Sequence, residues 1–347
     1  MLFFIFFITI TTSFLIAYVL EKFFLKKKLF IDKPSSRKTH KHPVPTAGGI
    51  SILFSFLVFV FLLNNFYEFD INLLNVLAIA ILPIMIVGLI DDYNEINIYI
   101  RLFAQFFSAA LIIYFFQIKN NALDVNIYTQ TSYIIIIISI ILSVWLMNLF
   151  NFMDGIDGYT ASQSVFVSFS ASIVAYINSP ENFLFIILLG LGFSNLGFLL
   201  RNWYPAKIFM GDTGSVSIGC IIAFFIFYSA SESLISIYTW LILLSIFIAD
   251  STYTLIVRIV TKKNILKPHL THGFHILTKN RNSQLFTTKS LIILNTLWVL
   301  PLAILSNIFM NFHIIITFIA YLPLLMYLIK IGAGLENQEI KWLKNII

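Results

Sequence analysis

Residues 148–160, N-L-F-N-F-M-D-G-I-D-G-Y-T, concentrate oxygen-bearing side chains in a chain that is otherwise strongly apolar. Asn148, Asn151, Asp154 and Asp157 follow one another at three-residue steps. Each Asp–Gly pair taken alone is an ordinary turn former. The four side chains together are better suited to binding a hard cation, or the hydroxyl and phosphate groups of a sugar.

Two further clusters are acidic. In D-D-Y-N-E-I-N, Asp91 and Asp92 directly follow an apolar run, where they suit a metal or a cationic partner but could equally end a helix in a solvated turn. In F-M-G-D-T-G-S, Asp212 stands before a predicted helix whose N-terminus favours anions. A lone acidic residue at such a place is more often a helix cap.

Two other clusters are basic. R-K-T-H-K-H-P-V-P-T-A-G-G contains Lys38, and it could bind phosphate or only mark the cytoplasmic side. His269, His272 and His275 lie three residues apart, and the alternative to phosphate binding is a solvated basic loop. Zinc is disfavoured, because the single cysteine, Cys220, lies in an apolar run and the other clusters offer hard oxygen ligands.

Together these groups suit phosphoryl transfer at a membrane surface. Mg²⁺ usually binds through one or two carboxylates plus the phosphates of a substrate. Lys, Arg and His would neutralise the remaining charge of a pyrophosphate. One substrate would then come from the cytosol and the other from the lipid.

The composition places these clusters in an integral membrane protein. Of the 347 residues, 59% are hydrophobic and 11% are charged, and the mean hydropathy is +0.92. Apolar runs near the length that crosses about 30 Å of hydrocarbon predict an all-α polytopic fold with eleven helices. We expect these helices near residues 2–20, 48–64, 72–90, 100–118, 132–148, 160–178, 183–200, 214–230, 234–257, 290–308 and 312–330.

The distribution of Lys and Arg predicts the orientation of these helices. With the N-terminus outside and the C-terminus cytoplasmic, 21 of the 22 basic residues fall in cytoplasmic segments, and Lys119 falls outside. All five polar clusters then lie on the cytoplasmic face, where they can converge on one site. The Lys26-Lys27-Lys28 cluster follows the first apolar run instead of preceding it, so we expect a retained helix and not a cleaved signal peptide.

Neither a linker nor a convincing internal repeat divides the chain, so residues 1–347 are predicted to form a single membrane domain. The net charge of +6 follows from the same charge asymmetry and from attraction to anionic headgroups. It therefore indicates membrane lipids as partners and requires no nucleic acid.

Four motifs occur in order on alternate loops: D-D-Y-N-E-I, N-L-F-N-F-M-D-G-I-D-G, N-W-Y-P-A-K-I-F-M-G-D-T-G-S and H-L-T-H. With this combination, residues 32–275 resemble the polyprenyl-phosphate N-acetylhexosamine-1-phosphate transferases. The resemblance implies an Mg²⁺-dependent enzyme of the cytoplasmic, or inner, membrane. It would transfer a sugar 1-phosphate from a UDP-sugar to undecaprenyl phosphate and release UMP, and it leaves a homodimer open.

The resemblance also implies roles for single residues. Asn151 and Asp212 fall where the family binds Mg²⁺, and Asp91 and Asp92 fall where its catalytic aspartate pair lies. The positions expected to contact nucleotide or phosphate are Asp154, Asp157, Asn202, Phe209, Lys38, Arg101, His269 and His272.

The spacing of the histidines bears on the substrate. The phospho-N-acetylmuramoyl-pentapeptide transferases of peptidoglycan synthesis carry consecutive histidines, whereas this chain has H-L-T-H-G-F-H. The spaced form is more similar to transferases that initiate O-antigen, capsule or wall-polymer synthesis. The resemblance thus implies an N-acetylhexosamine or deoxy-aminosugar donor, with the muramoyl-pentapeptide substrate as the alternative.

Two other classes of membrane protein remain as alternatives. A lipid or ion transporter would need ionisable residues near the middle of its spans, yet Asp250 is the one carboxylate well inside a predicted span, close to its cytoplasmic end. A CDP-alcohol phosphotransferase would need a longer aspartate series with an arginine. The residues after the second Asp–Gly pair, Y-T-A-S, do not supply one.

Overall fold

The structure is a computed structural model that describes residues 1–33, 42–67, 71–120, 130–265 and 269–336. The chain forms two compact units, Met1–Ile237 and Tyr238–Ile347, which are described separately below. Lys38 lies outside the described residues. The expectation of a single membrane domain stays a prediction.

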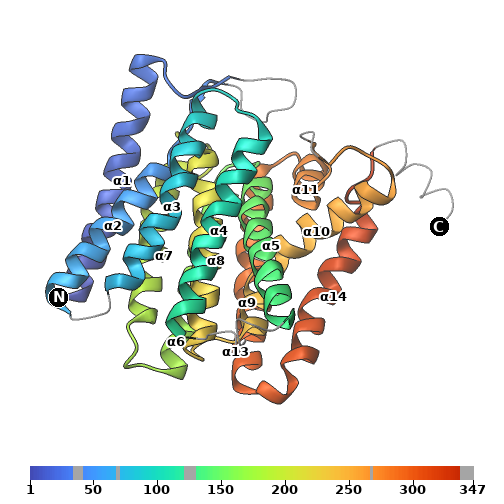
Figure 1. Ribbon diagram of the computed structural model, residues 1–347. Coiled ribbons are helices and arrows are strands. Elements are labelled where there is room, and N and C mark those ends of the chain that lie inside the picture. Colours follow the sequence, from blue (N-terminus) through green and yellow to red (C-terminus); the bar gives the residue numbers. More distant parts are fainter. Residues whose placement is uncertain (34–41, 68–70, 121–129, 266–268, 337–347) are drawn as a thin grey trace. The chain divides into compact units, whose positions relative to one another are not determined.

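The first unit is a bundle of long helices with one very short antiparallel ladder, in which Ile31 pairs with Pro45 and Asp32 with Val44. Figure 1 shows these helices side by side. The elements are α1 (Leu2–Lys27), β1 (Ile31–Asp32), β2 (Val44–Pro45), α2 (Gly49–Phe66), α3 (Ile71–Tyr93), α4 (Ile98–Asn120), α5 (Gln130–Met153), α6 (Tyr159–Asn178), α7 (Leu184–Asn202) and α8 (Gly211–Ser231).

The second unit is also helical. Its elements are α9 (Ile237–Leu243), α10 (Ser245–Val260), α11 (Gly273–Arg281), α12 (Gln284–Leu294), the π-helix η1 (Asn295–Val299), α13 (Leu300–Ile308), the 3₁₀ turn η2 (Met310–Phe312) and α14 (His313–Ile331). The segment Gln284–Ile308 forms one apolar span and Met310–Ile331 forms another.

Within the described residues, ten helices are long and apolar enough to cross a membrane, and a bent pair brings the number to eleven if it counts as one span. The prediction of an all-α multi-pass membrane protein is therefore confirmed. The ninth span, expected as one helix over residues 234–257, is wrong in shape. Helices α9 and α10 meet at an angle of 76°, although the sequence there contains neither Pro nor Gly.

Helix α8 is the centre of the first unit and packs against α2, α3, α4 and α5. Small residues permit these close contacts, because a Cβ added to Gly88 of α3 would lie 2.7 Å from Thr213 Cα. One added to Gly49 of α2 would lie 2.1 Å from Gly214 Cα. Close backbone approach of this kind is the usual basis of helix association in lipid. It brings the first turn of α8 against the ends of its neighbours.

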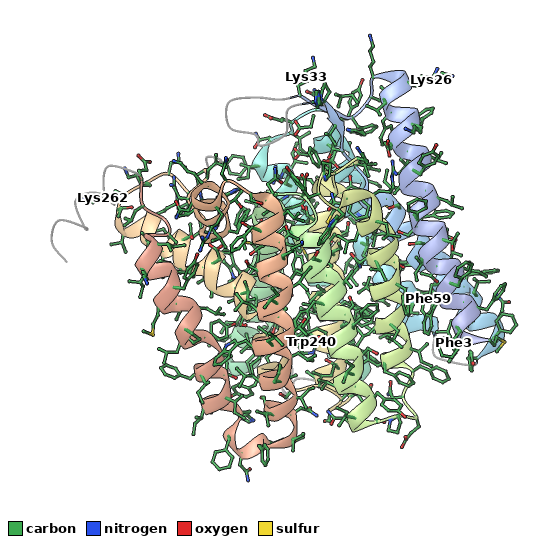
Figure 2. The ribbon with its side chains drawn as sticks, turned by 180° about the vertical axis from the view of Figure 1, so that it is seen from behind. Phe3, Lys26, Lys33, Phe59, Trp240 and Lys262 are labelled. Carbon is green, nitrogen blue, oxygen red and sulfur yellow. The ribbon has the colours of Figure 1, made fainter. Side chains whose placement is uncertain are left out.

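The end of α7 is tied to α1 by a partly buried ion pair. Arg201 donates to Glu21, and its guanidinium also lies over the ring of Tyr18, 5.2 Å from the centroid. Lys26 and Lys33 lie at this end of the unit, and Phe3 lies at the opposite end (Figure 2). The basic residues that follow the first span therefore share one end of the bundle with the polar clusters of the first unit.

Candidate functional site

Arg101 stands at the centre of a polar cluster formed by the ends of α3, α4, α5 and α8. Its Nη1 lies 3.1 Å from Asp91 Oδ2, and its Nη2 lies 3.2 Å from Asp212 Oδ2. Nη2 also donates to Asn151 Oδ1 at 3.4 Å. Three predicted site residues, each from a different motif, are thus gathered around the guanidinium group of a fourth, Arg101.

The two predicted metal ligands are direct neighbours. Asn151 Nδ2 donates to Asp212 Oδ1 at 2.8 Å and lies 3.4 Å from Ser215 Oγ. Asp212 Oδ2 is buried, and among the described residues its partner is the guanidinium of Arg101 at 3.2 Å, without a well-aligned hydrogen bond. A buried carboxylate oxygen beside an amide oxygen is a donor set that fits Mg²⁺.

No group of three or more His, Cys, Asp or Glu side chains in the described part of the chain could hold a metal. A magnesium site would need fewer protein ligands, because one or two carboxylates act together with substrate phosphates. Magnesium binding at Asn151 and Asp212 remains a prediction.

Asp92 has a different environment from that of Asp91. Its Oδ1 accepts from the backbone N–H of Asp212 at 2.9 Å, and its Oδ2 accepts from the backbone N–H and the hydroxyl of Thr213 at 3.1 and 2.6 Å. Asp91 instead accepts from Ile96 N at 2.9 Å and from Arg101. The N-terminus of α8, expected from the sequence to favour an anion, is occupied by the carboxylate of Asp92.

Asp157 and Asn202 join the loop before α6 to the loop before α8. Asp157 Oδ2 accepts from Ala206 N at 2.9 Å. Asn202 accepts from Gly158 N at 3.1 Å and donates to Ile208 O at 2.9 Å. Both side chains are buried, so the structure shows them holding two loops together. Their expected contact with the nucleotide stays a prediction.

Asp154 is the partly exposed carboxylate of the same loop. Burial, reinforced by the negative charges of Asp212 and Asp92, raises the pKa of Asp154 to about 8. Without a cation nearby, this group is largely protonated at neutral pH. A cation or a cationic substrate group would favour its ionised form.

Phe209 is fixed through its backbone to the segment before α2. Phe209 N donates to Pro45 O at 2.8 Å, and Phe209 O accepts from Gly48 N at 2.9 Å. In the same segment, Thr46 Oγ1 lies 3.3 Å from Asp92 Oδ1. The motif P-T-A-G-G is thereby attached to the Asp212 loop.

A small cavity lies beneath the polar cluster, between α3, α4 and α8. Its polar lining comes from Asp91, Arg101, Gln105 and Asp212, and its apolar lining from Ile84, Val87, Gly88, Ala104 and Val216. Gln105 is held by Asn148, whose Nδ2 donates to Gln105 Oε1 at 2.6 Å. The cavity therefore joins charged groups to an apolar wall within a membrane-spanning bundle.

The histidine motif belongs to the second unit. The rings of His269 and His272 stack with centroids 4.8 Å apart, and His272 Nδ1 lies 3.4 Å from Asp250 Oδ1. Asp250 also accepts from the backbone N–H groups of Gly273 and Phe274 at 2.7 and 2.9 Å. Asp250 therefore caps α11 and fixes the loop that carries the histidines.

Two of these histidines have lowered pKa values. Burial, reinforced by the neighbouring His272, lowers the pKa of His269 and of His275 to about 3. At such pKa values they would meet a phosphate mainly through hydrogen bonds. That His269 and His272 contact a phosphate stays a prediction.

Comparison with known proteins identifies the relatives of this chain. The model of glycosyl transferase family 4 matches residues 74–230, which contain the Asp91, Asn151 and Asp212 motifs. The chain is 27% identical over 316 residues, 90% of this chain and 86% of the relative, to a probable undecaprenyl-phosphate N-acetylglucosaminyl 1-phosphate transferase of Bacillus subtilis.

A second relative is a phospho-N-acetylmuramoyl-pentapeptide-transferase of Borreliella burgdorferi, with 30% identity over 68% of this chain and 74% of the relative. The undecaprenyl-phosphate alpha-N-acetylglucosaminyl 1-phosphate transferase of Thermotoga maritima is 29% identical over 77% of this chain and 79% of the relative. The chain belongs to glycosyl transferase family 4. The resemblance inferred from the four motifs is confirmed.

In each unit, contacts around the predicted residues involve side chains that were not expected from the sequence. Thr46 and Thr213 contact Asp92, Gln105 lines the cavity, and Asp250 supports the histidine loop. Thr46 and Thr213 lie inside two of the motifs quoted above, so their positions in the sequence could have indicated them. Asp250 was visible as an isolated carboxylate in an apolar run, where an ionisable side chain is costly unless it has partners.

Proposed function

We propose that this protein transfers a sugar 1-phosphate from a UDP-sugar to undecaprenyl phosphate at the cytoplasmic face of the inner membrane and releases UMP. The sugar would be an N-acetylhexosamine or a deoxy-aminosugar, and the product would begin a lipid-linked glycan such as O-antigen, capsule or wall polymer. The names of the Bacillus subtilis and Thermotoga maritima relatives support the undecaprenyl acceptor and the N-acetylhexosamine.

The observation that carries this proposal is the arrangement around Arg101. One guanidinium lies between two carboxylates and an amide, at the ends of helices long enough to span a membrane. This is where the headgroup of a polyprenyl phosphate would meet a water-soluble diphosphate. The adjoining cavity has an apolar wall, as a site open to lipid requires.

The chain's own residues would act mainly by position and charge. Asn151 and Asp212 would hold Mg²⁺, which when bound supplies charge stabilisation for the phosphates. Arg101 would neutralise phosphate oxygens as charge develops on them. Asp91 would orient the acceptor phosphate or remove its last proton at lower pH.

Direct in-line displacement is the favoured mechanism. A phosphate monoester has a second pKa of about 6, so most of the acceptor is already the ionised nucleophile at neutral pH. Its oxygen would attack the β-phosphorus of the UDP-sugar, the bond to the bridging oxygen would break, and UMP would leave. Positioning and charge neutralisation then account for the catalysis, as in other phosphoryl transfers.

The first test is a donor panel. Membranes that contain the protein would be incubated with undecaprenyl phosphate and one UDP-sugar at a time, and release of UMP would be measured. We expect one N-acetylhexosamine or deoxy-aminosugar donor to be turned over. Absence of UMP with every donor, in membranes where the protein is folded, would contradict the proposal.

A second candidate function must be tested in the same donor panel. The Borreliella burgdorferi relative is a phospho-N-acetylmuramoyl-pentapeptide-transferase of similar identity, so UDP-N-acetylmuramoyl-pentapeptide must be included. The spaced histidines of H-L-T-H-G-F-H argue against this donor. Turnover of the pentapeptide donor in preference to all others would establish the second function.

The mechanism has its own test. Protein incubated with a donor labelled in its β-phosphate, without undecaprenyl phosphate, should carry no covalent label if displacement is direct. A label that maps to Asp91 or Asp92 would establish a phosphorylated aspartate. Asp91→Asn should also lose less activity at pH 9 than at pH 6.5, because the acceptor then needs no base.

A further inference from the structure

We infer that Asp92 is a positioning residue, and that Asp91 is the member of the pair available to the reactants. The carboxylate of Asp92 joins α3 to the first turn of α8 and thereby holds Asp212 beside Asn151. The inference rests on the proposed function only where it assigns Mg²⁺ binding to Asp212. How Asp212 is held in place follows from the hydrogen bonds of Asp92.

The hydrogen bonds of Asp92 use both of its oxygens. Two backbone N–H groups, those of Asp212 and Thr213, and the hydroxyl of Thr213 point at this carboxylate. Thr46 Oγ1 adds a contact of 3.3 Å from the segment before α2. A carboxylate with these partners has little capacity left for a substrate proton or a metal.

These partners are the groups that a helix start leaves unsatisfied. The first four N–H groups of a helix have no partner within it, and a negative charge at that end is favoured by the helix dipole. Helix α8 begins at Gly211 without a side-chain cap of its own. Asp92 supplies the cap from another helix, across 120 residues of sequence.

The backbone around Asp92 leaves little space for other arrangements. Gly211 has φ +73°, and a Cβ there would lie 2.4 and 2.5 Å from the two Asp92 oxygens. One turn earlier on α3, Gly88 packs against the backbone of Thr213. The fit of α3 to α8 is therefore built around this carboxylate.

Asp91 has different hydrogen-bond partners from those of Asp92. It accepts one backbone N–H, from Ile96, and one guanidinium group, from Arg101. It lines the cavity that Arg101, Gln105 and Asp212 also line. Asp91 therefore faces the space where a phosphate would lie, whereas Asp92 faces the backbone of α8.

The test measures the first turn of α8 directly. Hydrogen–deuterium exchange of peptides that cover residues 210–216 would be followed in detergent for wild type, Asp92→Asn and Asp91→Asn. Asp92→Asn should accelerate exchange at residues 212 and 213 at least about tenfold, because an amide cannot accept from both N–H groups and the hydroxyl. Asp91→Asn should leave this exchange within about twofold of wild type.

A second readout follows binding without turnover. The Mg²⁺ concentration that gives half of the maximal thermal stabilisation should rise about tenfold in Asp92→Asn, and activity should partly return at high Mg²⁺. Loss of activity at every Mg²⁺ concentration, with unchanged exchange at residues 212 and 213, would overturn the inference. Hydrogen exchange and Mg²⁺-dependent thermal stabilisation are both measured without the UDP-sugar, so failure of the proposed function would leave these two readouts interpretable.

Thr213→Val provides a matched variant in case Asp92→Asn does not fold. It is nearly isosteric, and it removes the 2.6 Å hydroxyl bond to Asp92 while keeping the backbone N–H. Exchange at residues 212 and 213 should increase, by less than in a variant of Asp92 itself. Exchange equal to that of wild type would also overturn the inference.

Discussion

At the scale of single residues, Asp212 is the side chain on which the proposed metal site depends most. Asp212→Asn keeps the size of the side chain but removes the charge that would bind Mg²⁺. We expect turnover to fall by roughly a thousandfold, because metal coordination contributes several kcal/mol and each 1.36 kcal/mol is about tenfold in rate. The measurement is UMP release across a Mg²⁺ titration.

Ser215→Ala is the matched control for this prediction. Ser215 touches the same cluster only through a 3.4 Å contact with Asn151 Nδ2. Its loss should therefore cost less than about tenfold in turnover. Near-normal activity of Asp212→Asn, or activity that persists in excess chelator, would contradict the assignment of Asp212 to a metal.

Asp154 predicts a pH dependence of stability. Its pKa is about 8 in the folded protein and 3.8 as the unperturbed value, so between these values the folded protein binds a proton that the unfolded chain has released. The free energy of unfolding should therefore fall as the pH rises from about 4 to about 8. We expect a loss of roughly 2 kcal/mol, less than the full shift implies, because the side chain is partly exposed.

Melting curves in detergent and chelator, recorded between pH 5 and pH 8.5, measure this effect. The neutral Asp154→Asn variant cannot titrate at this position, so its melting temperature should decline less with pH than that of wild type. Identical pH dependence in the two proteins would show that Asp154 has an ordinary pKa.

At the scale of elements, α11 depends on a carboxylate from α10. Asp250 accepts from the first N–H groups of α11, at Gly273 and Phe274. Asp250→Asn can satisfy only part of this set, so we expect a loss of about 1 to 3 kcal/mol in stability. Hydrogen exchange in residues 272–281 should increase, and activity should fall with it.

Thr254→Val is the control at this scale. It removes one hydrogen bond of 3.2 Å to the same carboxylate and leaves the bonds to α11 in place. Its exchange in residues 272–281 should stay close to that of wild type. If Asp250→Asn also exchanges like wild type, the start of α11 is held by other groups.

At the scale of the whole molecule, the charge distribution predicts which side of the membrane each loop faces. Asn94 follows α3 and Glu181 lies between α6 and α7, and both side chains are exposed. In a Cys220→Ala variant, a cysteine at Asn94 should resist an impermeant thiol reagent in whole cells, whereas one at Glu181 should react. Labelling at Asn94 but not at Glu181 would invert the orientation.

The spans, the family and the proximity of Asn151 to Asp212 could be derived from the sequence. The length of an apolar run is a local property, and the bilayer imposes that length whatever the neighbouring helices do. The spacing of the motifs is likewise a property of the sequence, so the motifs can be recognised without knowledge of tertiary contacts. For these reasons the ten spans and the proximity of Asn151 to Asp212 agree with the structure, and the family agrees with the comparison with known proteins.

Other features were decided only by the tertiary structure. The 76° bend between α9 and α10 carries no Pro or Gly signal. Asp91 and Asp92 are identical in type and adjacent in sequence, yet one faces Arg101 and the other caps α8. Two partners of Asp92 lie 120 and 121 residues away, and a side chain's role is set by the donors that folding brings within about 3 Å. No local pattern specifies those donors.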